Sequence, residues 1–329
     1  MILAIMCGAV VSCASSAGKP DSRVSDEVSA DVGTQSMPAP ASTFNTDSAM
    51  AYLQRQVDFG PRVPGSDAHR RCADWIALTL RDMGYTVTDN TESVTHPVSG
   101  NKVSVRNIYA QSNPDATDRI VLLAHYDTRP WADHDADPSK HNTPIDGAND
   151  GASGVAVALE VARNISGLAP DKGVDILIVD LEDSGTYNDD ESWCIGSRHW
   201  AEHLPYKPGQ QPRFAVLLDM VGGKDAVFYR EYFSEAYASA INDLVWQTAK
   251  GAGHGDRFID KVGGAINDDH LSLLRAGIPA IDIIEMNVAN GGFNPTWHTT
   301  DDNIDNIDPA TINAVGHVIT KLISSQYDN

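Results

Sequence analysis

The pattern of apolar and polar positions along the chain predicts an α/β fold. Apolar residues recur at helical spacing over residues 47–58 and 66–83, and turn-forming residues at 60–65 separate the two helices that this spacing predicts. Farther along the chain, runs rich in β-branched residues alternate with helical patterns. The predicted strands cover residues 103–109, 120–125, 174–181, 214–218 and 279–284. The predicted helices among them cover residues 151–165, 195–203, 234–250, 268–276 and 309–325.

The order of these elements also predicts how the sheet is built. Strand sequences such as VDILIVDL and FAVLLD are almost continuously apolar, as expected for strands that are covered on both faces. Strands that alternate with helices are typical of a parallel sheet. We therefore predict a single α/β domain over residues 44–329, with a mostly parallel, mixed central sheet and helices on both faces.

The chain before this domain has a different composition. Residues 1–13 contain an apolar run that is too short to span a bilayer and that ends in small residues before Cys13. The sequence VVSC at residues 10–13 resembles the lipobox of bacterial lipoproteins, which implies cleavage before Cys13 and lipid attachment to its thiol. No Lys or Arg precedes the apolar run, so either the true start lies upstream or the segment is a plain secretory signal peptide. Residues 14–43 lack aromatic residues and are predicted to be a flexible linker. We expect an exported, periplasmic protein whose only membrane contact is a lipid anchor.

Charge and cysteine content argue against nucleic-acid binding, a disulfide-rich fold and a cysteine-ligated zinc site. The chain has 24 Lys and Arg against 45 Asp and Glu, a net charge of −21, which argues against binding to nucleic acid. It has four Cys and no CxxC pair, which argues against a disulfide scaffold and a thiolate zinc site. The sequence leaves open whether Cys72 and Cys194 form a disulfide, because geometry decides that question. Any metal ion must therefore be held by histidines and carboxylates.

Acidic residues and histidines gather at the predicted ends of the strands. In an open α/β sheet, ligands bind beyond the carboxyl ends of the strands. The candidate site residues at these ends and in the loops beyond them are His125, Asp150, Glu182, Asp183, Asp219, Asp268 and His298. Several carboxylates in one crevice repel one another unless a cation neutralises them, and an imidazole among them favours zinc. We expect one carboxylate of the adjacent pair Glu182 and Asp183 to bind the metal and the other to act as a general base.

Each of these residues also has an ordinary structural interpretation. Asp150 could cap the following helix, Asp219 could be a solvated turn residue, and His125 could support a ligand rather than bind metal. The acidic run at residues 301–306 is predicted to be a solvated turn. Other histidines are interpreted as structural or solvated, namely His69, His134, His141, His199, His203, His254 and His317.

Six short sequences point to a known family: HYDTR, GANDGASGV, LEDSG, LLDMVGG, DDHLSLLRAGIP and NPTWHTTDDNI. They resemble sequences of the zinc-dependent α/β aminopeptidases and, within that superfamily, of the glutaminyl-peptide cyclotransferases, or glutaminyl cyclases. The resemblance runs from about Phe44 to the C-terminus. Three features favour the cyclases: Trp193 shortly before GSRHWA, the block that begins with Asp268, and Trp297 directly before His298.

The resemblance implies a site and a reaction. It implies one zinc ion per chain held by Asp150, Asp183 and His298, with Glu182 as proton shuttle, Asp219 and Asp268 hydrogen-bonded to Glu182, and Trp193 and Trp297 lining the substrate pocket. The polar loop residues around both tryptophans also favour a pocket wall. The implied reaction converts the N-terminal glutamine of peptides and exported proteins to pyroglutamate and releases ammonia.

One difference from the cyclase pattern and one similarity to the aminopeptidases leave alternatives open. Animal cyclases carry Glu-Glu where this chain has Glu182 and Asp183, so the implied ligand is one methylene shorter. The aminopeptidases hold a second zinc with residues that this chain keeps as His125 and Asp219. A dizinc aminopeptidase that releases N-terminal amino acids is therefore the alternative, and a catalytically inactive peptide-binding lipoprotein is a third interpretation.

Overall fold

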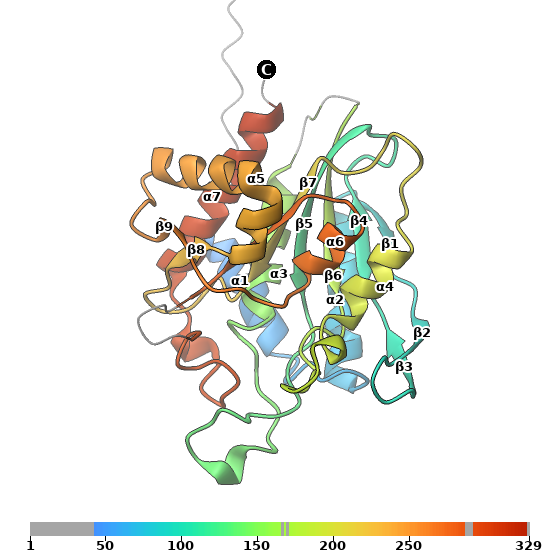
Figure 1. The fold of residues 1–329 in the computed structure, drawn as a ribbon, viewed down its shortest axis with the longest axis vertical. Helices are drawn as coiled ribbons and strands as arrows, with labels where there is room; N and C mark the ends of the chain where they lie inside the picture. Colours follow the sequence, from blue (N-terminus) through green and yellow to red (C-terminus); the bar gives the residue numbers. More distant parts are fainter. Residues whose placement is uncertain (1–42, 166–167, 169–170, 287–291, 328–329) are drawn as a thin grey trace, which may run out of the picture. The chain divides into compact units, whose positions relative to one another are not determined.

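The protein has a central sheet with helices on both faces (Figure 1). The computed structural model describes residues 43–165, 168, 171–286 and 292–327. The helices are α1 Thr46–Val57, α2 Asp67–Asp82, α3 Ala152–Asn164, α4 Ile195–Glu202, α5 Tyr232–Gly251, α6 His270–Arg275 and α7 Pro309–Tyr327. The strands are β1 Thr86–Thr88, β2 Glu92–Thr95, β3 Lys102–Val105, β4 Ile108–Gln111, β5 Asp118–His125, β6 Lys172–Val179, β7 Phe214–Asp219, β8 Phe228–Arg230, β9 Phe258–Val262 and β10 Ala280–Ile284. Short 3-10 helices cover Pro138–Lys140, Asp190–Ser192 and Ile304–Asn306.

The central sheet is mixed and mostly parallel, as the sequence predicts. Within the described part of the chain it has six strands in the order β1-β4-β6-β5-β7-β10. The four strands β6, β5, β7 and β10 run parallel to one another, whereas β4 is antiparallel to β6 and β1 is antiparallel to β4. Two small sheets, β2-β3 and β8-β9, lie beside it. The parallel strands therefore end at one edge, where an α/β protein places its ligands.

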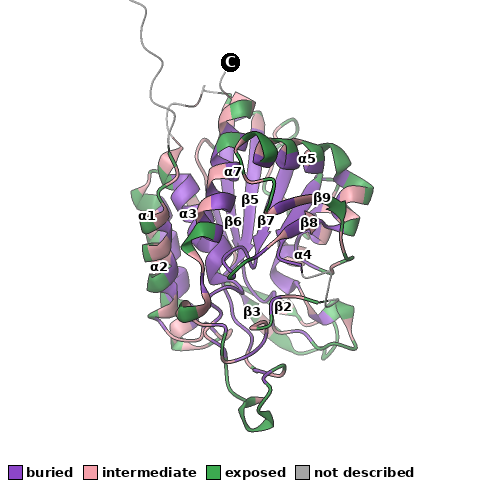
Figure 2. Cartoon of the chain, turned by 90° about the vertical axis from the view of Figure 1, so that its left-hand side faces the viewer, coloured by how far each residue is buried: buried purple, intermediate pink, exposed green. Residues whose placement is uncertain are grey.

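Two apolar clusters on opposite faces of the sheet hold the layers together. One face carries Ile120, Leu122 and alternate residues of the neighbouring strands, which pack with residues of α1, α2, α3, α5 and α7. The other face carries Val121 and Leu123, which pack in a smaller cluster with Trp200 of α4 and Leu273 of α6. Figure 2 shows the strands buried between helices whose outer surfaces are exposed. Burial on both faces explains why these strands have no polar alternation.

The first two helices begin where polar side chains satisfy their free N–H groups. Asn45 accepts a hydrogen bond from the backbone N–H of Ser48 at the start of α1, and Ser66 accepts one from His69 at the start of α2. Both residue types favour this position because their oxygen replaces the missing carbonyl of a preceding turn. Both helices lie within one residue of the predicted ranges.

The predicted strand 103–109 is wrong as a single element. The structure divides it into β3, which pairs with β2, and β4, which belongs to the central sheet. The break occurs because the backbone N–H of Arg106 donates to the carboxylate of Asp180, and the side chain of Asn107 donates to the carbonyl oxygen of Gly196. The apolar pattern does not register these long-range contacts. The short strands β1, β2, β8 and β9 were not predicted, because each has at most five residues and little periodicity.

The predicted signal peptide, residues 1–13, and the linker, residues 14–43, lie outside the described residues except for Thr43. None of the helices among the described residues is long and apolar enough to cross a membrane. Cys72 and Cys194 are buried free thiols, so they do not form a disulfide with each other.

A buried ion pair joins β5 and β6, and we expect its disruption to lower stability strongly. Arg119 and Asp175 are completely buried, and a guanidinium nitrogen lies 2.8 Å from the carboxylate. Replacement of Arg119 by Met leaves an uncompensated buried charge, which should lower the free energy of unfolding by about 3–5 kcal/mol in a urea titration. The control is Arg213→Met, because Arg213 pairs with Asp118 from a 40% exposed side chain, and this loss should be about 1 kcal/mol or less. Equal losses in the two variants would contradict this account.

Candidate active site

The candidate site residues gather at the edge where the parallel strands end. His125 ends β5 and Asp219 ends β7, whereas Glu182 and Asp183 lie in the loop after β6. Strand ends and loops enclose a cavity of about 280 Å³. The predicted site residues that line it are Asp150, Glu182, Asp183, Trp193, Asp219, Asp268, Trp297 and His298. The fold therefore brings these eight residues into one place, while His125 is buried, does not line the cavity and contacts Asp150 and Asp219.

Asp150 reaches the cavity from the turn before α3. The backbone N–H groups of Asn149 and Asp150 donate hydrogen bonds to the two carboxylate oxygens of Asp302, at 2.7 and 3.1 Å. Asp302 is only 1% exposed, so the prediction that residues 301–306 form a solvated turn is wrong at this position. The N-cap of α3 is Gly151, with a φ of 94°, so Asp150 does not cap the helix. Its carboxylate remains available to the site.

The turns that carry the site residues have a strained backbone. Non-glycine residues with positive φ include Leu181 (55°), Cys194 (56°), Met220 (45°) and His298 (56°). Leu181 precedes Glu182, and the buried carboxylate of Asp127 accepts hydrogen bonds from the backbone N–H groups of Glu182 and Asp183 at 3.1 and 3.2 Å. Such conformations cost about 1–3 kcal/mol each and persist where surrounding contacts impose them. The turn after β6 is therefore held in the shape that directs both acidic side chains into the cavity.

Asp150, Asp183 and His298 form a buried cluster that fits a metal ion. One potential ligand atom from each residue lies within 4.8 Å of the other two. His298 Nε2 is 3.0 Å from Asp183 Oδ1 and 3.5 Å from Asp150 Oδ2. Neither carboxylate oxygen of Asp183 receives a well-aligned hydrogen bond, although the residue is only 1% exposed, and the guanidinium of Arg129 is 3.7 Å from Oδ1. Two buried carboxylates this close together repel each other unless a cation lies between them, and two carboxylates with an imidazole suit zinc.

The pKa values in this cluster reflect the same need for a cation. Burial raises the pKa of Asp183 to about 6, and the neighbouring carboxylate of Asp150 adds to the shift. Burial opposes the charged form of His298, but Asp183 and Asp150 outweigh it and raise its pKa to about 9. The cluster therefore holds a proton tightly when no metal is bound, and metal binding must release it.

His125 and Asp219 form a second group of potential ligands together with Asp150. His125 Nε2 lies 3.1 Å from Asp150 Oδ1 and 3.2 Å from Asp219 Oδ1. Because Asp150 belongs to both groups, the geometry also accommodates the paired zinc ions of an aminopeptidase. Burial opposes protonation of His125, but the carboxylates of Asp127, Asp150 and Asp219 raise its pKa well above 6.5. The surrounding carboxylates therefore favour the protonated form of His125 when no metal is bound.

Glu182 opens into the same cavity but lies outside the ligand cluster. Burial raises its pKa well above the usual value, and the charges of Asp268 and Asp183 add to the shift. Burial also raises the pKa of Asp268 to about 7, with a contribution from Asp219. The structure shows no direct hydrogen bond among the side chains of Glu182, Asp219 and Asp268, although the resemblance implies such bonds. A carboxyl group that holds its proton more tightly than usual is suited to proton transfer near neutral pH.

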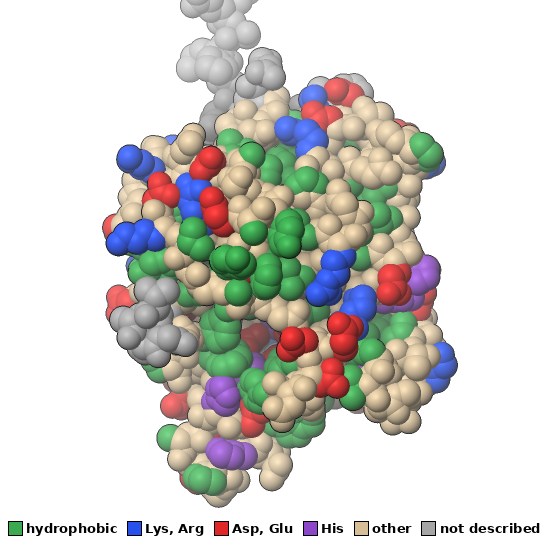
Figure 3. Space-filling view, in the orientation of Figure 1, with side chains coloured by type: hydrophobic (Ala, Val, Ile, Leu, Met, Phe, Trp, Pro, Cys, Tyr) green, Lys and Arg blue, Asp and Glu red, His purple; other side chains and the backbone are tan. Residues whose placement is uncertain are grey.

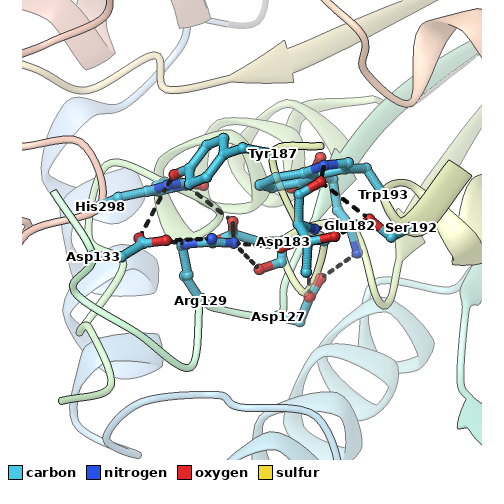
Figure 4. A network of polar contacts seen from close by, with 12 residues as sticks. Asp127, Arg129, Asp133, Glu182, Asp183, Tyr187, Ser192, Trp193 and His298 are labelled. Carbon is cyan, nitrogen blue, oxygen red and sulfur yellow. Dashed lines mark hydrogen bonds and ion pairs between the residues drawn. The ribbon is translucent and has the colours of Figure 1, made fainter. Parts of the chain in front are cut away.

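Aromatic side chains line the cavity beside the cluster of Asp150, Asp183 and His298. Figure 4 shows the rings of Tyr187 and Trp193 close to that of His298. The rings of Trp193 and His298 are stacked at 6.2 Å between centroids and 6° between planes. Trp297 stacks on His298 from the neighbouring position, at 3.9 Å. The hydroxyl of Tyr187 lies 2.5 Å from His298 Nδ1, so it orients the imidazole and leaves Nε2 facing the carboxylates. Both predicted tryptophans thus lie beside the cluster.

Arg129 and Tyr187 belong to this site but were not predicted from the sequence. Arg129 is buried, and its guanidinium lies 4.9 Å from the ring centroid of Trp193 and 5.1 Å from that of Tyr187. It donates to the backbone oxygen of Asp183 at 3.2 Å and to the carboxylate of Asp133 at 2.8 and 2.6 Å. Arg129 ends the HYDTR sequence, which begins at the end of a buried strand, and this position could have identified it as a candidate site residue. Tyr187 lies in a polar loop that has no such signal.

Comparison with known proteins supports the family resemblance that the motifs imply. The model of peptidase family M28 matches residues 107–323. Glutaminyl-peptide cyclotransferase of Bos taurus is 28% identical over 244 residues, which cover 66% of this chain and 64% of the bovine protein. The matched segment therefore spans slightly less than two thirds of that relative.

Two solved bacterial structures have a higher sequence identity to this chain than the bovine protein has. Glutaminyl cyclase of Bacteroides thetaiotaomicron, bound to N-acetylhistamine, is 46% identical with a TM-score of 0.81, and the match covers 85% of this chain and 98% of that one. A Zn-dependent exopeptidase of Parabacteroides distasonis is 42% identical with a TM-score of 0.82, and the match covers 88% of this chain and 100% of that one. The resemblance inferred from the motifs is confirmed: the chain belongs to peptidase family M28 and, within it, to the glutaminyl-peptide cyclotransferases.

Proposed function

We propose that this protein is a zinc-dependent glutaminyl cyclase that converts the N-terminal glutamine of peptides and exported proteins to pyroglutamate and releases ammonia. The observation that carries the proposal is the arrangement of the cavity. A buried cluster suited to zinc, an acid outside that cluster and two tryptophans line the same 280 Å³ space. Similarity to glutaminyl cyclases over almost the whole length of a solved structure adds support.

We assign one zinc ion per chain to Asp150, Asp183 and His298. Zinc held there would polarise the side-chain amide carbonyl of the substrate and stabilise negative charge on its oxygen. His125 is buried and does not line the cavity, which favours a single ion there. Animal cyclases have Glu at the position of Asp183, whose side chain is one methylene shorter. The backbone N–H groups of Glu182 and Asp183 donate hydrogen bonds to Asp127, and these bonds hold the turn that carries the Asp183 carboxylate into the cluster.

The other residues of the cavity supply proton transfer and substrate orientation. Glu182 takes a proton from the attacking α-amine and delivers it to the side-chain nitrogen, which leaves as ammonia while the new ring C–N bond forms. Asp219 and Asp268 provide acceptors that orient the amine. Trp193 and Trp297 cover the reacting groups and exclude water, so that attack by the amine is favoured over hydrolysis.

A dizinc aminopeptidase is the second candidate, because His125, Asp150 and Asp219 together offer ligand atoms within 4.8 Å of one another. It would use the same carboxylates to activate water, and it would cleave the first peptide bond. The tryptophan wall of the cavity favours the cyclase.

Mass spectrometry of a short peptide with N-terminal glutamine separates the two candidates. The purified protein should reduce the peptide mass by one ammonia and leave every peptide bond intact. Pretreatment with a zinc chelator should remove this activity, and added Zn²⁺ should restore it. A peptide with N-terminal alanine is the control and should be unchanged. Release of the whole first residue from either peptide would reject the cyclase and support the aminopeptidase.

We also propose that the protein is exported to the periplasm and anchored through a lipid on Cys13. The support is the apolar run of residues 1–13, the lipobox-like VVSC and the linker-like composition of residues 14–43. Membrane association should be lost in Cys13→Ala, and fractionation of the two forms would test this. Persistent association of the variant would contradict the anchor.

A further inference from the structure

The C-terminal end of α4 carries a group of metal-ligating side chains that lies apart from the cavity. We propose that His199, Glu202 and His203 bind a divalent transition-metal ion such as Zn²⁺ at the protein surface. One potential ligand atom from each lies within 4.8 Å of the others. This site revises the interpretation of both histidines as structural or solvated, and it does not rest on the proposed function.

The helix itself brings the two imidazoles together. His199 lies in the last turn of α4, His203 is the C-cap residue that follows the helix, and their ring centroids are 4.5 Å from each other. Glu202 reaches the group from the adjacent helical position. Tetrahedral zinc with bonds of the usual length places its ligand atoms about 3.4 Å apart, so small side-chain rotations would complete the coordination. Such rotations are available because Glu202 and His203 are exposed.

Hydrogen bonds leave each imidazole with one nitrogen available to a metal ion. His203 Nδ1 donates to the backbone oxygen of His199 at 2.8 Å, which leaves the lone pair of Nε2 free to bind. His199 Nε2 lies 3.0 Å from a carboxylate oxygen of Glu92. Donation to that carboxylate leaves the lone pair on Nδ1 of His199. A carboxylate behind a ligating histidine is the usual arrangement in metal sites, because it fixes the tautomer and raises the basicity of the ring.

The surroundings also favour a cation. The group lies at the negative end of the α4 dipole and beside the carboxylates of Glu92 and Glu202. Acidic and histidine side chains meet at the right-hand edge of the surface shown in Figure 3. His199, His203 and Glu92 line a cavity of about 350 Å³, which leaves room for a water or a small ligand at the fourth position, whereas Glu202 lines a different cavity and would turn toward the histidines to bind. Because Glu92 belongs to β2, the ion would join α4 to the β2-β3 hairpin.

Metal analysis of the full-length protein tests the site. After equilibration with Zn²⁺ and removal of free metal, the double variant His199→Ala/His203→Ala should retain one ion fewer per chain than the unmodified protein. His96→Ala is the matched control, because this histidine lies in the connection between β2 and β3 but outside the group, and it should retain the full number. An equal zinc content in the double variant and the unmodified protein would overturn the proposal.

A second measurement separates this ion from the ion in the cavity. In the His298→Ala background, added Zn²⁺ should still raise the unfolding temperature, because a ligand that binds only the folded state stabilises it. The triple variant with His199→Ala and His203→Ala should show no such shift. A shift of the same size in the triple variant would reject the surface site. Peptide cyclisation by the double variant should equal that of the unmodified protein, which distinguishes failure of this site from failure of the proposed enzyme.

Discussion

Replacement of Glu182 by glutamine should lower kcat for cyclisation by about 100- to 10,000-fold, the usual contribution of a positioned general acid–base. Glutamine has almost the same shape but cannot exchange a proton, and Glu182 lies in the cavity outside the ligand cluster. The zinc content of the variant should therefore equal that of the unmodified protein. Initial rates with a glutaminyl peptide, together with metal analysis of the same sample, provide the measurement.

The matched control for this variant is Glu191→Gln. Glu191 is exposed, does not line the cavity and pairs with Arg198, so the same chemical change should leave kcat within about twofold, as expected for a surface ion pair. Full activity of Glu182→Gln would remove Glu182 from the mechanism. Loss of zinc from that variant would instead place Glu182 among the ligands.

Replacement of Asp183 or His298 by alanine should remove the zinc ion and with it the activity. Each variant leaves only two of the three side chains that would hold the ion. Zinc per chain, measured after dialysis against a weak chelator, should fall to the content of the surface site alone. Retention of the cavity zinc in either variant would contradict the ligand assignment.

The variant Asp219→Asn tests whether the cavity binds one zinc ion or two. Asp219 contacts His125 and belongs to the second potential ligand group. With one ion in the cavity, this variant should keep its zinc and lose only part of its activity. A loss of one ion per chain on this substitution would show that His125 and Asp219 bind a second zinc, as in an aminopeptidase.

The gathering of acidic residues at one edge of the sheet could be predicted from the sequence because its main signals are local. Glu182 and Asp183 follow the buried strand β6 after a two-residue interval, Asp219 ends β7, and parallel strands end at the same edge of a sheet. Asp150, His298 and the two tryptophans lie in turns and loops, where the types of the flanking residues marked them as candidates and the family motifs assigned their roles. Arg129 and Tyr187 were missed, since neither residue type signals a site unless its neighbours in space are known.

The sequence by itself determined the class of the fold, the order of its main helices and buried strands, and the chemical character of the site. These properties follow from hydrophobic periodicity and from residue types at strand ends, which are legible within a short stretch of chain. Tertiary structure decided the rest. It buried Asp302 against the turn of Asp150, divided the predicted strand 103–109 at contacts with Asp180 and Gly196, and placed Glu92 against His199. Each of these outcomes depends on a partner far away in the sequence, and only packing of the whole domain brings such partners together.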